Sequence, residues 1–330
     1  MTRAPKAHKT YHEQVQLLAE RGMDMGDRGR AAITLSRVNY YRLSGYWYPF
    51  RKRSGRTRLD EFLPGTRFED VVALYNFDAR LRAAAFTALA PVELALRALL
   101  GHELGRIDPC IHLKPQLLGP TAQQQEYTTW LERHELDVDH RSREEFVKHH
   151  KQQYEGQLPI WVAVELLDWG SLTQLYRFAP PAAQDEIAGA CGLSAPQLTS
   201  WLRALNLIRN ICAHHGRLFN RVHSFQPKLP KLLPEDLAAV AEGRPHVWSR
   251  TFGQLTLIQY LSTCLAVGDR SLLTNAVACF PKISAIPITH TGAPHRWQHD
   301  CGPLWQTLPT VAPRRTPAAG SRTPSPAPPR

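Results

Sequence analysis

The run from Phe68 to Leu104 constrains the fold of this chain more than any other sequence feature. Apolar residues recur along it at the three- and four-residue spacing of an α-helix, at Val71, Val72, Leu74, Phe77, Leu81, Ala85 and Leu89. After Pro91 the pattern continues as "VELALRALLGHEL", and the proline should start or kink a helix there. The pattern therefore predicts a long, strongly helical segment.

Helical patterns also cover most of the remaining chain. We expect two short helices within 12–37, one helix around 144–154, one over 158–179 with a break near Gly170, one beginning at a Ser194 cap and one over 252–267. Residues 106–155 otherwise read as a long polar connection. No strand-like alternation appears outside 40–66, where "RKRSGRTRLDEFLPGT" predicts a basic loop or hairpin. The predicted fold class is all-α.

Composition divides the chain into a folded part and a tail. An apolar content of 43% suffices for a core. We expect one α-helical domain over 8–280, in which 8–66 form a small N-terminal part with helices, an aromatic block and the basic loop. Residues 281–330 hold 11 of the 26 prolines and few apolar side chains, so we predict a disordered, basic, Pro-rich tail there.

Charge and cysteine content limit the function classes. The formal net charge of +11 and pI of about 9.6 favour a polyanionic partner such as RNA. Six cysteines are scattered without a C-x-x-C pair, which argues against a zinc cluster or a disulfide framework and fits a reducing cytoplasm. We see no apolar stretch of about 18 residues and no apolar signal core, so neither membrane insertion nor secretion is expected.

The candidate site is the stretch "RNICAHHGRLFNR" at 209–221. An Arg-x(4–6)-His pattern supplies a cation for a phosphate and an imidazole for proton transfer, but seven arginines of this chain satisfy it. Helix geometry discriminates better. At about 100° per residue, Asn206, Asn210 and Arg217 share one stripe, with Arg209 about 60° to one side and His214 about 80° to the other.

This projection separates the two adjacent histidines. His214 lies beside the arginines. His215 falls on the opposite, apolar side and is expected to be a structural residue pointing toward the core, together with Trp201, Leu205, Ile208, Ile211 and Cys212. The stripe contains no acid between Asn206 and Arg221, which suits an anion. Arg209 and His214 are about 140° apart on an ideal helix. Gly216 could swing the last turn, or two chains could combine their residues across a two-fold axis; we favour the homodimer.

Further phosphate contacts are expected outside the helix. The predicted set is Asn206, Arg217 and Arg221 around the stripe, and Arg42, Arg51 and Arg53 in the aromatic block and basic loop. Glu165, Asp168 and the "HHxxxY" segment at 149–154 lack convincing metal-ligand spacing, so no metal and no cofactor is predicted.

Four blocks, in this order, carry a family resemblance: "VNYYRLSGYWYPF", "VVALYNFDARLRAAAFTALAPVELALRALLGHELG", "LPIWVAVELLDWGSLTQLY" and "WLRALNLIRNICAHHGRLFNR". Across about 8–225 the chain resembles the Abi_2 (AbiD/AbiF-like) abortive-infection family of the HEPN superfamily. The resemblance implies an α-helical HEPN-type bundle and an RNase toxin that halts growth of phage-infected bacteria, with an RNA or protein antidote possible. Its Arg-x4-His motif falls on Arg209, Asn210 and His214, which implies metal-independent cleavage by the RNA 2′-OH.

Two other functions remain open at this stage. The same stripe could grip a phosphate without turnover in a non-catalytic RNA-binding or partner-binding defence protein. It could also be a solvated surface of a purely structural helical bundle.

Overall fold

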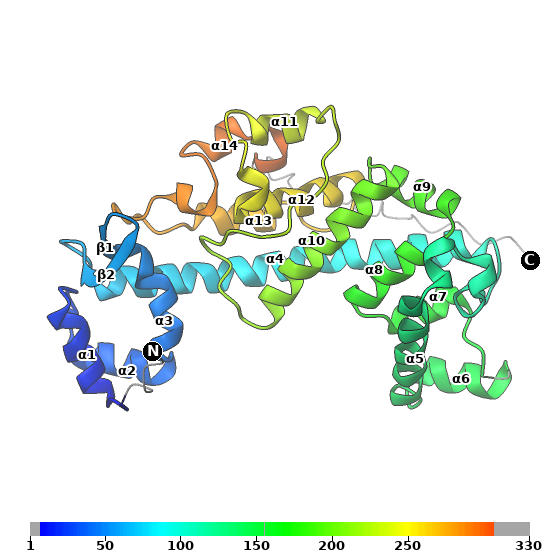
Figure 1. Cartoon of the computed structure of the whole chain (residues 1–330), viewed down its shortest axis with the longest axis horizontal. Helices are drawn as coiled ribbons and strands as arrows, with labels where there is room; N and C mark the ends of the chain where they lie inside the picture. The colour runs from blue at the N-terminus through cyan, green and yellow to red at the C-terminus, as the bar shows by residue number, and fades with distance from the viewer. Residues whose placement is uncertain (1–6, 155, 307–330) are drawn as a thin grey trace, which may run out of the picture.

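The computed structural model describes residues 7–154 and 156–306 (Figure 1). Within them, the chain forms α-helices and one antiparallel hairpin. The helices are α1 (Tyr11–Glu20), α2 (Arg28–Arg37), α3 (Tyr40–Trp47), α4 (Phe68–Gly105), α5 (Gln125–His140), α6 (Glu145–Gln153), α7 (Ile160–Ala163), α8 (Trp169–Phe178), α9 (Pro181–Ala190), α10 (Ala195–Ala213), α11 (Glu235–Ala241), α12 (Thr251–Cys264), α13 (Ser271–Ala278) and α14 (Trp297–Asp300); the strands are β1 (Arg51–Ser54) and β2 (Thr57–Phe62). The all-α class is confirmed.

Helix α4 is the axis of the molecule. It runs through most of its length in Figure 1 and contacts α3, α7, α9, α10, α12 and α13. Glu69 and Asp70 lie in its first turn, where negative charge complements the helix dipole. The helix continues through Pro91 as one element, although Pro91 was expected to start or kink a helix. Partners along both halves of α4 hold it together where the proline removes a hydrogen bond.

One property of α4 corrects the sequence analysis. Within the described residues, α4 is the one helix that is long enough and apolar enough, over an 18-residue window, to cross a membrane. The expectation that the chain has no apolar stretch of about 18 residues was therefore wrong. A core helix of a soluble protein passes the same test. In this structure α4 packs against α10, α12 and α13 rather than standing apart from them.

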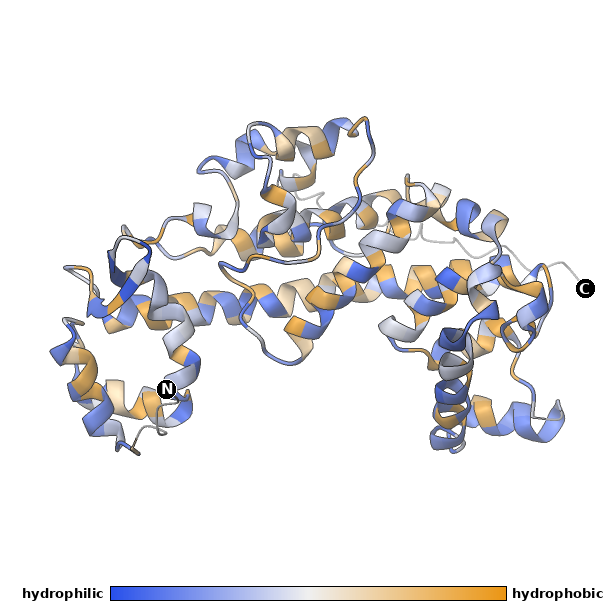
Figure 2. Ribbon diagram, in the orientation of Figure 1, coloured by the Kyte–Doolittle hydropathy of each residue, from blue (hydrophilic) through white to orange (hydrophobic). Residues whose placement is uncertain are grey.

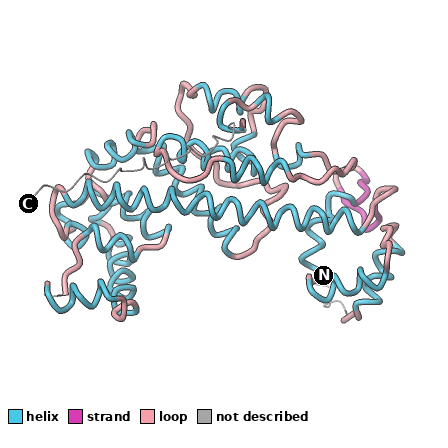
Figure 3. Tube along the Cα trace, turned by 180° about the vertical axis from the view of Figure 1, so that it is seen from behind, coloured by secondary structure: helices cyan, strands magenta, loops and turns pink. Residues whose placement is uncertain are grey.

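The N-terminal part is a small lobe at one end of α4. Helices α1, α2 and α3 are each capped by a side chain, from Thr10, Asp27 and Asn39 respectively. The hairpin of β1 and β2 follows α3, and Figure 3 shows both strands at the same end of the molecule as the N-terminal helices. Two backbone hydrogen bonds join the segment after α1 to the hairpin and to the residues before α4. The Phe62 N–H donates to the Arg21 carbonyl, and the Asp24 N–H donates to the Thr66 carbonyl.

The region between α4 and α8 contains more helix than its sequence predicted. Helix α5 lies in the segment that was expected to be a polar connection. The sequence did not predict this helix because few of its residues are buried, namely Tyr127, Trp130 and His134. The indole N–H of Trp130 donates to the Ser171 carbonyl at 3.0 Å. The break expected near Gly170 is present just before α8, whose first turn is capped by Asp168.

The C-terminal elements fold onto α12, the most deeply buried helix. Every residue from Thr251 to Ser262 is buried, and α12, which packs against α4, carries many hydrophobic residues along its ribbon in Figure 2. Residues 281–306 were assigned to a disordered tail, and that assignment is wrong for them: Trp297, Leu304 and Trp305 are buried. A few large aromatic side chains outweigh the proline-rich composition of this segment. The remaining expected tail, 307–330, lies outside the described residues.

Candidate functional site

Helix α10 carries the helical part of the site predicted from sequence. Ser194 forms the expected capping box, in which Gln197 accepts from the Ser194 backbone N–H at 2.8 Å. The apolar face is buried as predicted, through Trp201, Leu205, Ile208 and Cys212. The α10 helix therefore presents its polar residues to the opposite side.

The helix ends at the two histidines, and this changes the role expected for His215. His214 is the C-cap and is exposed. His215 adopts a left-handed backbone with φ of +54° and is also exposed, so the prediction that it points toward the core was wrong. The Gly216 N–H donates to the Ile211 carbonyl at 2.7 Å, which closes the helix in a Schellman-type turn. Helical angles do not apply to residues beyond that turn.

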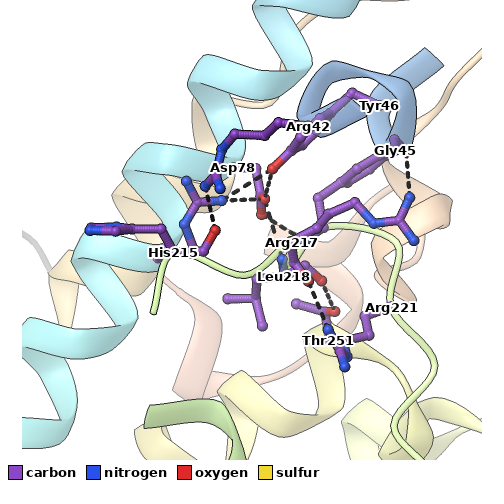
Figure 4. A network of polar contacts seen from close by, with 11 residues as sticks. Arg42, Gly45, Tyr46, Asp78, His215, Arg217, Leu218, Arg221 and Thr251 are labelled. Atoms are coloured by element: carbon purple, nitrogen blue, oxygen red, sulfur yellow. Dashed lines mark hydrogen bonds and ion pairs between the residues drawn. The ribbon is translucent and has the colours of Figure 1, made fainter. Parts of the chain in front are cut away.

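The loop after α10, which we call the 214–221 loop, is tied to α4 by Asp78 (Figure 4). Asp78 is completely buried. Its carboxylate accepts the backbone N–H of Phe219 at 2.6 Å and that of Leu218 at 3.2 Å. It also accepts the Tyr46 hydroxyl at 2.5 Å and forms an ion pair with Arg82. One side chain thus connects α3, α4 and the 214–221 loop.

The charge state of Asp78 follows from these partners. Burial raises the pKa of the Asp78 carboxyl, while the Arg82 guanidinium and the hydrogen bonds from Tyr46, Phe219 and Leu218 act against the rise. All of these neighbours donate, so the ionised carboxylate satisfies them and a protonated acid would leave a donor facing donors. Burial also raises the pKa of Tyr46, which keeps its hydroxyl proton in place as a donor.

Two arginines predicted to bind phosphate instead hold backbone carbonyls. Arg42 donates to the His215 carbonyl, and Arg217 donates to the Gly45 carbonyl (Figure 4). The Arg42 guanidinium also lies 5.8 Å from the ring centre of Tyr75. These contacts clamp the 214–221 loop against α3, so the main role of both guanidinium groups in this structure is structural.

Three of the predicted residues meet at one pocket of about 390 Å³. Asn210 and His214 reach it from the end of α10, and Arg221 reaches it from the far end of the 214–221 loop. The lining is completed by Leu207, Ile211, Gly216, Val222, His223 and Ser224. No carboxylate lines this pocket, and its polar side chains are an amide, a guanidinium, a hydroxyl and two imidazoles. We call it the His214 pocket.

His223 is the functional candidate that the sequence analysis missed. It is 6% exposed, and its Nε2 is buried without a hydrogen-bond partner in the described residues. Burial, together with the charges of Arg221 and Arg250, lowers the pKa of His223 to about 4. The ring is therefore a neutral imidazole near pH 7. A signal for it existed, because His223 completes the Arg-x(4–6)-His pattern that begins at Arg217.

Asn206 and Arg209 lie on another side of α10, toward α8. The amide of Asn206 lies close to Gly170. The Arg209 guanidinium lies 5.7 Å from the ring centre of Phe86. Burial acts to raise the pKa of Asp168, but hydrogen bonds from Ser171 and the nearby charges of Arg133 and Arg209 hold it below its ordinary value. The sequence has no acid between Asn206 and Arg221, but the fold brings the Asp168 carboxylate close to Arg209.

The hairpin residues lie in the N-terminal lobe. Arg51 pairs with Asp60 at 3.2 Å, a carboxylate that Arg21 also contacts, whereas Arg53 is exposed. The structure brings Asn210, His214 and Arg221 together, and it does not bring Arg209, Arg51 or Arg53 to the same pocket.

The arrangement provides the parts of a metal-free phosphodiester site. A guanidinium and an amide bind phosphate oxygens, and imidazoles accept and donate protons near neutral pH. Across the described residues, no group of three or more His, Cys, Asp or Glu side chains is placed to hold a metal ion.

Comparison with known proteins gives one match. The sequence profile of a family described as "Abi-like protein" matches residues 33–220, more than half of the 330-residue chain. The match runs from within α2 to residue 220, so it includes Asp78, all of α10 and His214, and it ends one residue before Arg221. No curated protein and no solved structure matches the chain.

Proposed function

Because this chain belongs to the Abi-like protein family, which points to abortive infection and phage defence, we propose that it is a metal-independent endoribonuclease of the HEPN type. In this proposal the protein acts in the bacterial cytoplasm and halts growth of the infected cell by cutting RNA. The His214 pocket is the site of cleavage.

The observation that supports this proposal best is the composition of the His214 pocket. Arg221 supplies positive charge, Asn210 supplies an amide, and the lining contains no carboxylate to repel a phosphate. Two imidazoles share this space, and one of them, His223, is neutral near pH 7. A polyanionic substrate also fits the net charge of +11.

The proposed reaction is an internal transfer within the RNA. The 2′-oxygen attacks the adjacent phosphorus and its proton passes to the His214 imidazole; the bond from phosphorus to the 5′-oxygen then breaks as His214 gives that proton to the 5′-oxygen. The products are a 2′,3′-cyclic phosphate and a 5′-hydroxyl. His214 is the exposed imidazole that carries a proton, Asn210 orients the phosphate, and a guanidinium stabilises the charge that develops on the phosphoryl oxygens.

Arg209 enters this scheme through a second copy of the chain. Within one chain it faces α8 and Phe86, away from the His214 pocket. Leu207 and Val222 line the pocket and are 42% and 63% exposed, which is apolar area that a second copy could cover. We propose a homodimer in which Arg209 of one copy approaches His214 of the other. Light scattering at micromolar concentration tests this arrangement, and a monomer that retains full activity contradicts it.

The decisive experiment compares wild type with Arg209→Ala and His214→Ala. Each is expressed from a tightly repressed promoter, growth is followed, and RNA 5′ ends are sequenced after induction. Purified protein is also incubated with single-stranded RNA in EDTA. We expect wild type to produce 5′-hydroxyl ends without a metal, and both variants to lose at least about 100-fold in cleavage rate.

The matched control is His102→Ala. His102 is an exposed histidine that completes the pattern beginning at Arg97, but it lies on α4 away from the His214 pocket. The control should cleave RNA as wild type does. If wild type binds RNA without new ends, and His214→Ala binds equally well, the protein is the non-catalytic RNA-binding alternative. If neither binding nor cleavage is seen, the nuclease proposal is wrong.

A further inference from the structure

A second pocket, larger than the first, lies in the N-terminal lobe. It has a volume of about 960 Å³, within the range of roughly 300–1,000 Å³ that small-molecule sites occupy. Its lining comes from the segment before α1, from α1 and its C-terminal end, and from the junction of α2 and α3. The lining residues that bear on a ligand are Lys9, Tyr11, Gln14, Arg21, Arg37, Tyr40 and Tyr41. We call it the lobe pocket.

The charged residues of the lobe pocket are all cations. Arg21 is paired with Asp60 at 3.2 Å. Lys9 and Arg37 have no carboxylate partner within the part of the chain that the structure describes. No Asp or Glu lines the pocket. The Lys9 charge also acts on the Glu13 carboxylate, which lies outside the pocket lining. Lys9 and Arg37 still make the edge of this concave site positive, and positive charge attracts a phosphate group, which is close to doubly ionised as a monoester and singly ionised as a diester.

The aromatic residues of the lobe pocket are unusually exposed. Tyr41 is 85% exposed and Tyr11 is 48% exposed, although both are large side chains on well-formed helices. Tyr40 is half-buried, and its ring packs edge-on against Trp47 with 4.8 Å between ring centres. Exposed tyrosines beside cations are the combination that stacks nucleobases and holds their phosphates. Core packing does not explain the position of Tyr41.

One buried polar atom in the pocket wall also lacks a partner. The amide nitrogen of Gln14 donates to the Lys9 carbonyl at 3.0 Å, but its Oε1 is buried and accepts no hydrogen bond from the described residues. A buried acceptor without a donor costs free energy. An amino group of a base or a hydroxyl of a ribose would supply the missing donor.

From these features we infer that the lobe pocket binds a nucleotide, with the base against Tyr11 and Tyr41 and the phosphate between Lys9 and Arg37. The same chemistry is offered by a free nucleotide and by one nucleotide of an RNA strand. This inference does not depend on cleavage at the His214 pocket. The two sites nevertheless share α3, since Tyr41 lies one residue before Arg42, which holds the His215 carbonyl.

The test measures binding on the full chain, without any activity readout. AMP and ATP are titrated into the protein by calorimetry, and a fluorescein-labelled hexanucleotide of single-stranded RNA is titrated by anisotropy. The variants are Tyr41→Ala and Arg37→Ala, each expected to weaken binding about tenfold or more. The matched controls are Tyr154→Ala and Arg80→Ala, an exposed tyrosine and an exposed arginine outside the pocket. Circular dichroism checks that each variant is folded.

The outcomes separate the sources of the ligand and the two proposals. Binding of AMP or ATP that both pocket variants weaken and both controls retain supports a free nucleotide. Binding of the hexanucleotide alone, with the same variant pattern, supports a nucleotide within RNA. If no probe binds, or if pocket variants and controls behave alike, the inference is wrong. Loss of cleavage in His214→Ala with unchanged nucleotide binding shows that nucleotide binding at the lobe pocket does not depend on the His214 pocket.

Discussion

The carboxylate of Asp78 accepts the backbone N–H of Phe219 at 2.6 Å, and so joins the N-terminal third of α4 to a loop 141 residues further along the chain. Leu218 donates to the same carboxylate, and Thr251 donates to the Leu218 carbonyl at 2.6 Å. The 214–221 loop therefore has fixed anchors on α4 and on α12. His214 and Arg221 flank these anchors, which explains how two residues seven positions apart line one pocket.

We expect Asp78→Ala to lower the free energy of unfolding by about 3–5 kcal/mol. The substitution leaves the buried Arg82 guanidinium without its partner and two backbone N–H groups without an acceptor. Urea denaturation followed by circular dichroism measures the loss. Glu132→Ala, at an exposed position on α5, is the control and should change stability by less than about 0.5 kcal/mol. Equal effects of the two substitutions would contradict the anchoring role.

We expect His215→Gly to raise the free energy of unfolding by about 0.5–1 kcal/mol. His215 has a φ of +54° at the position that closes α10, and glycine adopts this backbone without steric cost. Part of the gain is offset by the greater freedom of glycine in the unfolded chain. Thermal or urea denaturation measures the change. His214→Gly is the matched control, because the φ of His214 is −91° and glycine there brings no relief.

We expect the protein to lose stability as the pH falls from about 6.5 toward 4. Burial lowers the pKa of His112 to about 3 and that of His223 to about 4. Unfolded histidine titrates near pH 6.5, so between these values the unfolded chain takes up protons that the folded chain does not. Above pH 6.5 both states are neutral and the effect vanishes. At pH 5 each of these two histidines should lower the free energy of unfolding by roughly 2 kcal/mol relative to neutral pH.

Urea denaturation at pH 7.5 and at pH 5.0 measures this dependence. The difference between the two values should shrink in His112→Phe, because that side chain no longer binds a proton on unfolding. Taking the difference within each variant cancels any change in packing. His102→Ala, at an exposed position of α4, should keep the wild-type difference. An unchanged difference in His112→Phe would show that His112 does not carry the effect.

We expect Trp305→Ala to lower the free energy of unfolding by about 3–5 kcal/mol. Trp305 is fully buried, its ring lies 4.3 Å from that of Phe252 centre to centre, and its indole N–H donates to Thr256 at 3.0 Å. Leu232→Ala, at a side chain that is 89% exposed, serves as the control and should have little effect. If Trp305→Ala left the free energy of unfolding nearly unchanged, residues 281–306 would contribute little to the core.

The sequence by itself determined the all-α class, several of the helices and the buried face of α10. Local rules were sufficient there, because the Ser194 cap and the spacing of Trp201, Leu205 and Ile208 act within a few residues of chain. The blocks that suggested the family were also local in character, and the family match over 33–220 confirms them. Helix α5 was missed for the same reason, since too few of its residues are apolar for the period to show.

Only the tertiary structure decided which polar residues share a site. Helical projection placed Asn210 and Arg217 on one stripe with His214 beside it, but α10 ends at Ala213, and beyond that point the position of a residue depends on what the loop is attached to. Asp78 and Arg42 make those attachments from more than 130 residues away. His223 joins the pocket for the same reason, and Arg209 leaves it because α8 and Phe86 cover its side of the helix. Long-range contacts of this kind have no signature in local spacing, which is why a single sequence could suggest the chemistry but not its assembly.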